Sequence, residues 1–214
     1  MTLDVHTTEE FTTYMKRYPQ LYMELASDIK DSLSSASPVI LDLGCGPGLL
    51  IKAIHTTLSA AMVVGIDVSQ EMLRLAYQQE KQASTKGDLI QGTAEHIPLQ
   101  DASVDAVVSR FSLPYWKKPE QGFAEIHRIL KPKGLLILDA LNKDFPRWRL
   151  RLIQLHMHLN KATQKVIAYH VDAYAIAYTR KEIEELLSRT GLTLKGIKGK
   201  KNSWSYRIIA EKRE

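Results

Sequence analysis

The sequence predicts an α/β fold in which a mostly parallel sheet carries helices on both faces. Short apolar runs alternate with amphipathic helical patterns between residues 38 and 140, as in chains whose strands and helices follow one another in a parallel sheet. The first apolar run leads into the string Asp42-Leu43-Gly44-Cys45-Gly46-Pro47-Gly48, and the second ends in Asp67. A glycine turn after one strand, followed by a carboxylate at the end of the next, is the layout of a nucleotide-binding sheet.

The stretch from residue 9 to residue 33 carries apolar side chains at helical spacing. We expect one amphipathic helix, or two helices broken near Pro19, with Thr8 as the N-terminal cap. The apolar stripe is rich in aromatic residues, including Tyr14 and Tyr18. It therefore fits either a helix packed on the sheet or a cap over a ligand pocket.

The core from residue 38 to residue 140 is expected to alternate strands with helices. Strands are expected at 38–43, 62–67, 89–91, 104–109 and 135–138, and helices at 47–58, from Ser69 onward and at 119–131. Ser69 is suited to cap its helix, and Pro132 and Gly134 to end the last one.

The C-terminal third departs from simple alternation. Residues 145–175 have a helical pattern, interpreted as an insertion or lid. Thr179 is expected to cap a further helix that ends at Gly191, with strands near 192–198 and 204–211. Residues 179–214 would thus supply a helix and a closing hairpin.

The composition describes an ordinary globular chain of 214 residues, for which one domain over residues 1–214 is the natural expectation. No apolar run approaches the roughly 20 residues of a membrane span, and no secretory signal is visible at the N-terminus. The single cysteine cannot form an internal disulfide and counts against a cysteine-ligated metal. We therefore expect a cytoplasmic protein without a metal site. A net charge of +5 fits an acidic ligand, nucleic acid or neither.

The glycine string resembles motif I of class I S-adenosylmethionine-dependent methyltransferases, since it reads Gly-x-Gly-x-Gly with an acid two residues before the first glycine. Most nicotinamide or flavin folds instead show Gly-x-Gly-x-x-Gly. The stretches 65–72, 91–99, 104–109 and 126–134 resemble later motifs of the family. The closest likeness is to the small-molecule branch, methyltransferase type 11, which includes the ubiquinone- and menaquinone-biosynthesis C-methyltransferases.

This resemblance implies a Rossmann-like, doubly wound, seven-stranded sheet that is mostly parallel with an antiparallel last strand. It also implies S-adenosylmethionine as cofactor and S-adenosylhomocysteine as product. Asp42 would lie near the amino group, Asp67 would accept hydrogen bonds from both ribose hydroxyls, and Val68 and Met72 would enclose the adenine. The family commonly has an acid where this chain has Thr93. The cofactor-binding residues implied are Asp42, Gly44, Cys45, Gly46, Gly48, Asp67, Val68, Met72, Thr93, Ala94, Glu95 and Ser109.

Residues 109–116 form the expected acceptor-side loop. The loop lacks the Asn/Asp-Pro-Pro-Tyr/Phe signature of enzymes that methylate amino groups of bases or of glutamine, so those acceptors are disfavoured. The candidate acceptor contacts are Tyr14, Tyr18, Arg110, Tyr115 and Trp116. Methyl transfer from a sulfonium chiefly requires alignment, so no catalytic group is assigned. The candidates for such a role are His156, His170, Tyr115 and Arg110.

The predicted function is methyl transfer from S-adenosylmethionine to a small-molecule acceptor by direct in-line displacement. An RNA methyltransferase is the first alternative and would need two basic groups on one face beside the cofactor pocket: Arg147, Arg149 and Arg151, and Lys195, Lys198, Lys200 and Lys201. A non-catalytic cofactor-binding protein would have a collapsed acceptor cavity, and a nicotinamide oxidoreductase is the third alternative. The sequence leaves open the acceptor, the atom methylated (C, N, O or S), and whether the protein is a monomer or a homodimer.

Overall fold

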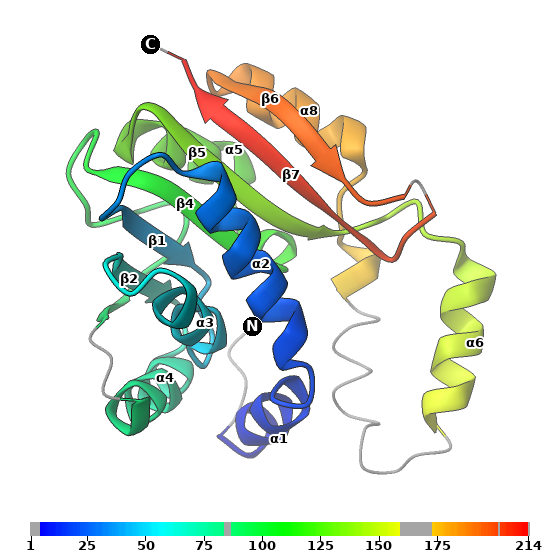
Figure 1. Ribbon diagram of the computed structural model, residues 1–214. Coiled ribbons are helices and arrows are strands. Elements are labelled where there is room, and N and C mark those ends of the chain that lie inside the picture. The colour runs from blue at the N-terminus through cyan, green and yellow to red at the C-terminus, as the bar shows by residue number, and fades with distance from the viewer. Residues whose placement is uncertain (1–4, 84–86, 159–172, 201, 214) are drawn as a thin grey trace.

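A computed structural model describes residues 5–83, 87–158, 173–200 and 202–213 (Figure 1). Within these residues, seven strands form one sheet in the order β3-β2-β1-β4-β5-β7-β6. The strands are β1 (Val39–Leu43), β2 (Met62–Asp67), β3 (Asp88–Gln91), β4 (Val104–Arg110), β5 (Leu130–Leu141), β6 (Leu192–Lys198) and β7 (Ser205–Lys212). Strands β1 to β5 pair in parallel, whereas β7 is antiparallel to both of its neighbours. The predicted mostly parallel sheet with an antiparallel last strand is confirmed.

Helices cover both faces of this sheet. They are α1 (Val5–Met15), α2 (Pro19–Ser32), α3 (Leu49–Thr57), α4 (Gln70–Ala83), α5 (Pro119–Ile129), α6 (Arg147–His158) and α8 (Arg180–Arg189), with a short 3₁₀ turn, η1 (Leu113–Tyr115). Apolar residues of α2 and α3 pack with Ile40 and Val63 on one face. Residues of α5 and α8 pack with Leu41 and Val64 on the other. Successive side chains of β1 and β2 therefore pack into the cores on opposite faces of the sheet, which explains why these strands are mostly apolar.

The N-terminal stripe forms two helices, as the alternative with a break near Pro19 predicted. Pro19 stands at the start of α2, where its missing N–H is not needed. The expected cap at Thr8 is wrong, because α1 already begins at Val5. Thr8 is buried within this helix, and its carbonyl accepts a 2.8 Å hydrogen bond from the Thr12 hydroxyl.

Two boundaries in the core differ from those expected. The helix predicted at 47–58 begins only at Leu49, because Gly48, its N-cap, still has a positive φ of 77°. The helix predicted at 119–131 ends at Ile129, and β5 starts at Leu130 rather than at residue 135. Pro132 disfavours a helical backbone at the residue before it, Lys131. The pairing of β5 with β4 also shifts register between Leu130 and Leu135.

The C-terminal elements follow the predicted order. The Thr179 hydroxyl accepts a hydrogen bond from the Glu182 N–H, and the Glu182 carboxylate accepts one from the Thr179 N–H. This capping box starts α8. In the predicted 145–175 stretch, helix α6 is present, and residues 159–172, including His170, lie outside the described residues. None of the described helices is long and apolar enough to cross a membrane.

Candidate cofactor and acceptor site

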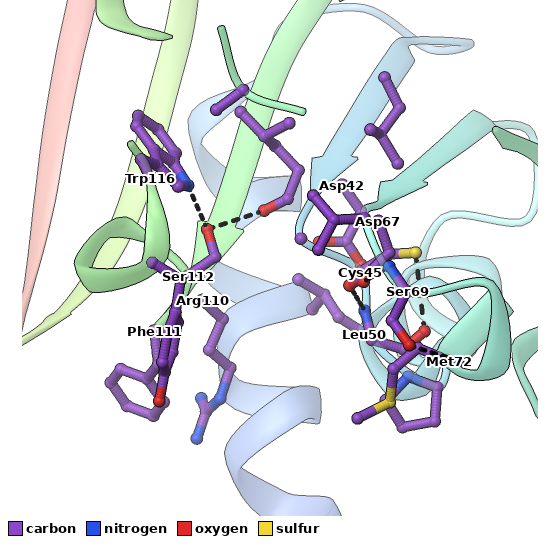
Figure 2. Close-up of a pocket in the computed structure, with 18 of the residues that line it drawn as sticks. Asp42, Cys45, Leu50, Asp67, Ser69, Met72, Arg110, Phe111, Ser112 and Trp116 are labelled. Atoms are coloured by element: carbon purple, nitrogen blue, oxygen red, sulfur yellow. Dashed lines mark hydrogen bonds between the residues drawn. The ribbon is translucent and has the colours of Figure 1, made fainter. Parts of the chain in front are cut away.

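A cavity of about 240 Å³ lies at the carboxyl ends of β1, β2 and β4. Ligands of open α/β sheets bind at this edge. One side is lined by the glycine turn, Asp42 and Asp67, and the opposite side by Arg110 and Phe111 (Figure 2). Part of the lining also comes from α1 and α2. The cavity therefore joins the expected cofactor residues to the expected acceptor loop.

The turn after β1 is held by backbone hydrogen bonds to the neighbouring strand. The N–H groups of Gly44 and Cys45 both donate to the carbonyl of Ile66, at 2.7 and 3.0 Å. Gly44, Gly46 and Gly48 have φ values of 77°, 52° and 77°, a region that disfavours side chains. The turn thus requires glycine for its backbone shape at all three positions.

Two of these glycines differ in what surrounds them. A Cβ at Gly44 would lie 2.4 Å from the Ser112 Cβ, whereas a Cβ at Gly46 would have no protein atom within 4 Å. The open space over Gly46, which lines the cavity, is room that a bound ligand can occupy. Gly44 instead lets the turn pack against the loop after β4.

This contrast yields a paired prediction. Gly46→Ala should fold, with a cost of about 1–2 kcal/mol for the left-handed backbone, and should bind S-adenosylhomocysteine at least ~10-fold more weakly because the new methyl enters the ligand space. Gly44→Ala should lose more stability, since overpacking against Ser112 adds roughly 1–3 kcal/mol. Thermal denaturation and calorimetric titration measure the two effects. Equal stability loss in both variants would contradict the assignment.

Asp67 closes the turn from the end of β2. One oxygen of its carboxylate accepts from the Gly46 N–H at 2.8 Å and the other from the Ser69 N–H at 2.9 Å. Burial raises the pKa of this carboxyl, and hydrogen bonds from the backbone of Ser69, Gly46 and Val68 oppose the rise. Each carboxylate oxygen can accept a further hydrogen bond. Asp67 can therefore support the glycine turn and accept from a vicinal diol at the same time.

Asp42 is the most unusual ionisable group of the site. Its side chain is buried, and Oδ2 has no hydrogen-bond partner among the described residues. Burial, together with the nearby charge of Asp67, raises the pKa of Asp42 to about 8, although Arg110 opposes the rise. A buried carboxylate oxygen without a partner costs stability. A cationic group in the cavity would supply the missing partner.

The remaining predicted cofactor residues divide into two groups. Cys45, Val68, Met72 and Ala94 line the cavity. Cys45 is free and buried, and burial raises its pKa well above the ordinary value, which makes it a poor nucleophile. The residues that do not line the cavity are Gly48, Thr93, Glu95 and Ser109.

The residues outside the cavity have structural contacts. Gly48 caps α3, and Glu95 accepts a 3.0 Å hydrogen bond from the Lys118 N–H. Thr93 forms an isolated bridge with His96. Ser109 is fully buried and donates to the carbonyl of Leu43 at 2.8 Å.

The loop after β4 is tied to the end of β1 through Ser112. The Ser112 hydroxyl accepts from the Trp116 indole N–H at 3.0 Å (Figure 2). It also lies 2.6 Å from the Ser109 hydroxyl and 3.2 Å from the Leu43 carbonyl. Ser112 lines the cavity but was not predicted as a site residue. Ser112 belongs to the expected acceptor-side loop, but only the tertiary structure shows its contact with the end of β1. The network keeps the acceptor loop in register with the glycine turn.

Three of the predicted acceptor contacts, Arg110, Tyr115 and Trp116, line the cavity, whereas Tyr14 and Tyr18 do not. Tyr14 and Tyr18 pack against each other, with ring centroids 5.4 Å apart. The N-terminal helices instead contribute Phe11, Met15 and Tyr22. Phe11 and Met15 are one helical turn apart, so they lie on one side of α1. All these positions belong to the apolar stripe in residues 9–33. The sequence pattern did not indicate which side of each helix would face the cavity.

Of the two histidine candidates, His170 lies outside the described residues. His156 belongs to α6, but the structure describes only its backbone. No sequence signal pointed to Leu141 or Ala173, which line the cavity through the end of β5 and the start of the segment that precedes α8. These are small or apolar residues, and only the tertiary structure places them here.

Comparison with known proteins places this site in context. Residues 41–138 match the family of methyltransferase domains. Demethylmenaquinone methyltransferase of Lactiplantibacillus plantarum is 36% identical over 111 residues, which are 50% of this chain and 47% of the relative. Malonyl-[acyl-carrier protein] O-methyltransferase of Methylococcus capsulatus is 30% identical over 155 residues, which are 72% of this chain and 51% of the relative. The chain thus spans about half the length of these two curated relatives.

Among solved structures, the S-adenosylmethionine-dependent methyltransferase from Aquifex aeolicus superposes with a TM-score of 0.67. The match covers 90% of this chain and 97% of the other, at 17% sequence identity. An identity this low supports the fold alone. The fold, the glycine turn and the acid after β2 are thus three separate observations consistent with a methyltransferase domain.

Proposed function

We propose that the chain is a class I S-adenosylmethionine-dependent methyltransferase that transfers a methyl group from this cofactor to a small-molecule acceptor, and the match of residues 41–138 to a methyltransferase domain supports this. The observation that carries the proposal is the shared cavity. Asp42, Asp67 and the glycine turn line one side, and the aromatic and apolar residues of α1, α2 and the loop after β4 line the other. One cavity thus has room for a donor and an acceptor in contact.

The residues on the donor side fit the cofactor of this family. Gly46 leaves open space above the turn, and the unpartnered Oδ2 of Asp42 suits the ammonium group of the methionine end. Asp67 suits the ribose hydroxyls, since a carboxylate accepts two hydrogen bonds side by side. Val68 and Met72 supply apolar surface for the adenine.

When bound, the cofactor supplies a methyl group activated by a positively charged sulfur. The acceptor would contribute the electron pair for the new bond to the methyl carbon, and the electrons of the broken carbon–sulfur bond would stay on sulfur as a neutral thioether. The protein's task is then alignment and exclusion of water. Phe11, Met15, Tyr22 and Phe111 line the acceptor side, so we propose α1 and α2 as its cap. No general base is needed where the bound acceptor is already ionised.

The alternatives receive less support. For an RNA substrate, the two basic groups would need to flank the cavity, yet none of their members that the structure describes lines it. Lys195 is paired with Glu211, and Lys198 with Asp28, which reduces the charge available for phosphates. If the protein only bound the cofactor, its acceptor side would be expected to be collapsed. In this structure the cavity extends to the acceptor loop, where Arg110 and Phe111 line it. We also expect a cytoplasmic location, because the one cysteine is a free thiol.

The proposal is tested first by calorimetric titration of the protein with S-adenosylhomocysteine, with NAD as the control. We expect binding of S-adenosylhomocysteine and none of NAD. A screen of small-molecule acceptors with methyl-labelled donor then tests transfer itself. Binding of NAD alone, or of neither compound, would overturn the proposal at its first step.

A further inference from the structure

The guanidinium of Arg110 is held in one orientation at the acceptor side of the cavity. Its carbon lies 4.8 Å from the ring centroid of Tyr22 and 4.6 Å from that of Phe111. Nη1 donates to the Asp139 carboxylate at 3.2 Å and lies 3.5 Å from the carbonyl of Leu21. Stacked rings and an ion pair both restrict the plane of the group.

One nitrogen of this guanidinium, Nε, is buried and has no partner among the described residues. The hydrogen bonds to Asp139 and Leu21 both start from Nη1, and the Tyr22 hydroxyl also hydrogen-bonds the guanidinium. The Arg110 side chain is only 8% exposed, so water does not readily compensate. Nε and Nη2 together form the edge with which arginine binds a carboxylate through two parallel hydrogen bonds. Since Arg110 lines the cavity, a ligand there can reach this edge.

The charges around Arg110 also favour an anion. Asp139 pairs with Arg110 and Arg207, and Asp28 pairs with Arg207 and Lys198. This cluster contains three cations and two carboxylates, so it retains one positive charge. Asp42 also faces Arg110, but with a pKa of about 8 it is largely neutral at pH 7. Tyr22, whose pKa is raised to about 12 by burial, stays protonated.

We propose that Arg110 forms a carboxylate-binding subsite of the cavity, with the Tyr22 hydroxyl as a second donor beside it. The inference rests on the proposed function, because the cavity is taken to hold the cofactor and the acceptor together. The carboxylate belongs either to the methionine end of the cofactor or to the acceptor. Both sources present the same planar anion, and the aromatic rings of Tyr22 and Phe111 fit a flat acceptor next to it.

Two pairs of probes separate these sources in the wild-type protein. S-adenosylhomocysteine and its methyl ester differ only in the charge of the carboxylate. Benzoate and benzamide, added to protein saturated with S-adenosylhomocysteine, compare a flat carboxylate with a neutral analogue. Calorimetry measures the first pair, and ligand-observed NMR measures the second.

Arg110→Gln is the test variant. Asp139 keeps its two hydrogen bonds from Arg207, so the variant should fold. Arg180→Gln is a matched control, because Arg180 also stacks on a tyrosine ring, at 5.0 Å from that of Tyr206, and has an unpartnered Nε. Arg180 does not line the cavity. Thermal denaturation of both variants measures the structural cost that they share.

If the cofactor supplies the carboxylate, the wild type should bind S-adenosylhomocysteine about 10- to 100-fold more tightly than the ester, and Arg110→Gln should remove the difference. If the acceptor supplies it, benzoate but not benzamide should bind, and Arg110→Gln should abolish benzoate binding. A wild-type protein that discriminates within neither pair would overturn the proposal whether or not Arg110→Gln is stable, since this comparison uses only the wild type. Discrimination that persists unchanged in folded Arg110→Gln would overturn it as well. A wild-type protein that binds no S-adenosylhomocysteine would instead refute the proposed function.

Discussion

Asp67→Ala should weaken S-adenosylhomocysteine binding by at least ~100-fold, because hydrogen bonds to a charged group are worth about 1.5–3 kcal/mol each and two are lost. The effect has a second source in the protein itself. The same carboxylate accepts from the N–H groups of Gly46 and Ser69, so its removal also loosens the turn beneath the ligand. Calorimetric titration of the variant measures the loss.

Asp67→Asn separates these two contributions. The amide keeps one acceptor oxygen and the shape of the side chain, so we expect an affinity between those of the wild type and Asp67→Ala. Asp31→Ala, at an exposed position of α2, should bind like the wild type. Wild-type affinity in Asp67→Ala would remove Asp67 from the cofactor site.

Asp42→Asn should stabilise the ligand-free protein at pH 8 while it weakens cofactor binding. The pKa of Asp42 is about 8 in the folded chain and about 3.9 in an unfolded chain. Between these values the unfolded state binds fewer protons, so the free energy of unfolding falls as pH rises from about 4 to 8. Asparagine does not titrate. The cost of roughly 1.4 kcal/mol per pKa unit is therefore absent from the variant.

Thermal denaturation at several pH values measures this effect. We expect a Tm about 5 °C or more above wild type at pH 8, with a difference that shrinks toward pH 4. At pH 8, where Asp42 is about half ionised in the ligand-free protein, S-adenosylhomocysteine should bind about 10- to 100-fold more weakly, since the carboxylate proposed to pair with its ammonium is gone. Asp31→Asn is the control for a general change of charge. A variant with unchanged stability and unchanged affinity would contradict the assigned role of Asp42.

The sequence located residues on both sides of the cavity, and it missed some on each side. The glycine string and Asp67 lie at the ends of β1 and β2, two strands that follow one another along the chain, and they were predicted from turn residues and strand ends, which are local properties. The loop from Ser109 to Trp116 was also located, because it follows an apolar strand. For the N-terminal helices, the pattern located the helices but selected Tyr14 and Tyr18, whereas Phe11, Met15 and Tyr22 line the cavity.

Element boundaries failed where a local signal had two meanings. Thr8 resembles a cap, but lies inside α1 because the helix extends to Val5. Pro132 and Gly134 resemble a helix end, yet they lie within the first residues of β5. At β5, the pairing of Leu130 with Val104 on β4, which a local pattern does not contain, starts the strand before Pro132.

The sequence by itself determined the order of strands and helices, the glycine turn, the acid after β2 and the resemblance to the methyltransferase family. Hydrophobic periodicity and backbone conformation act over a few residues, so they can be read along the chain. Only the tertiary structure decided that Arg110 is stacked between Tyr22 and Phe111 with an unpartnered Nε, and that Asp42 is buried without a partner for Oδ2. Burial and charge pairing depend on residues far apart in sequence, such as Arg110, Asp139 and Arg207, which meet only when β4, β5 and β7 form one sheet.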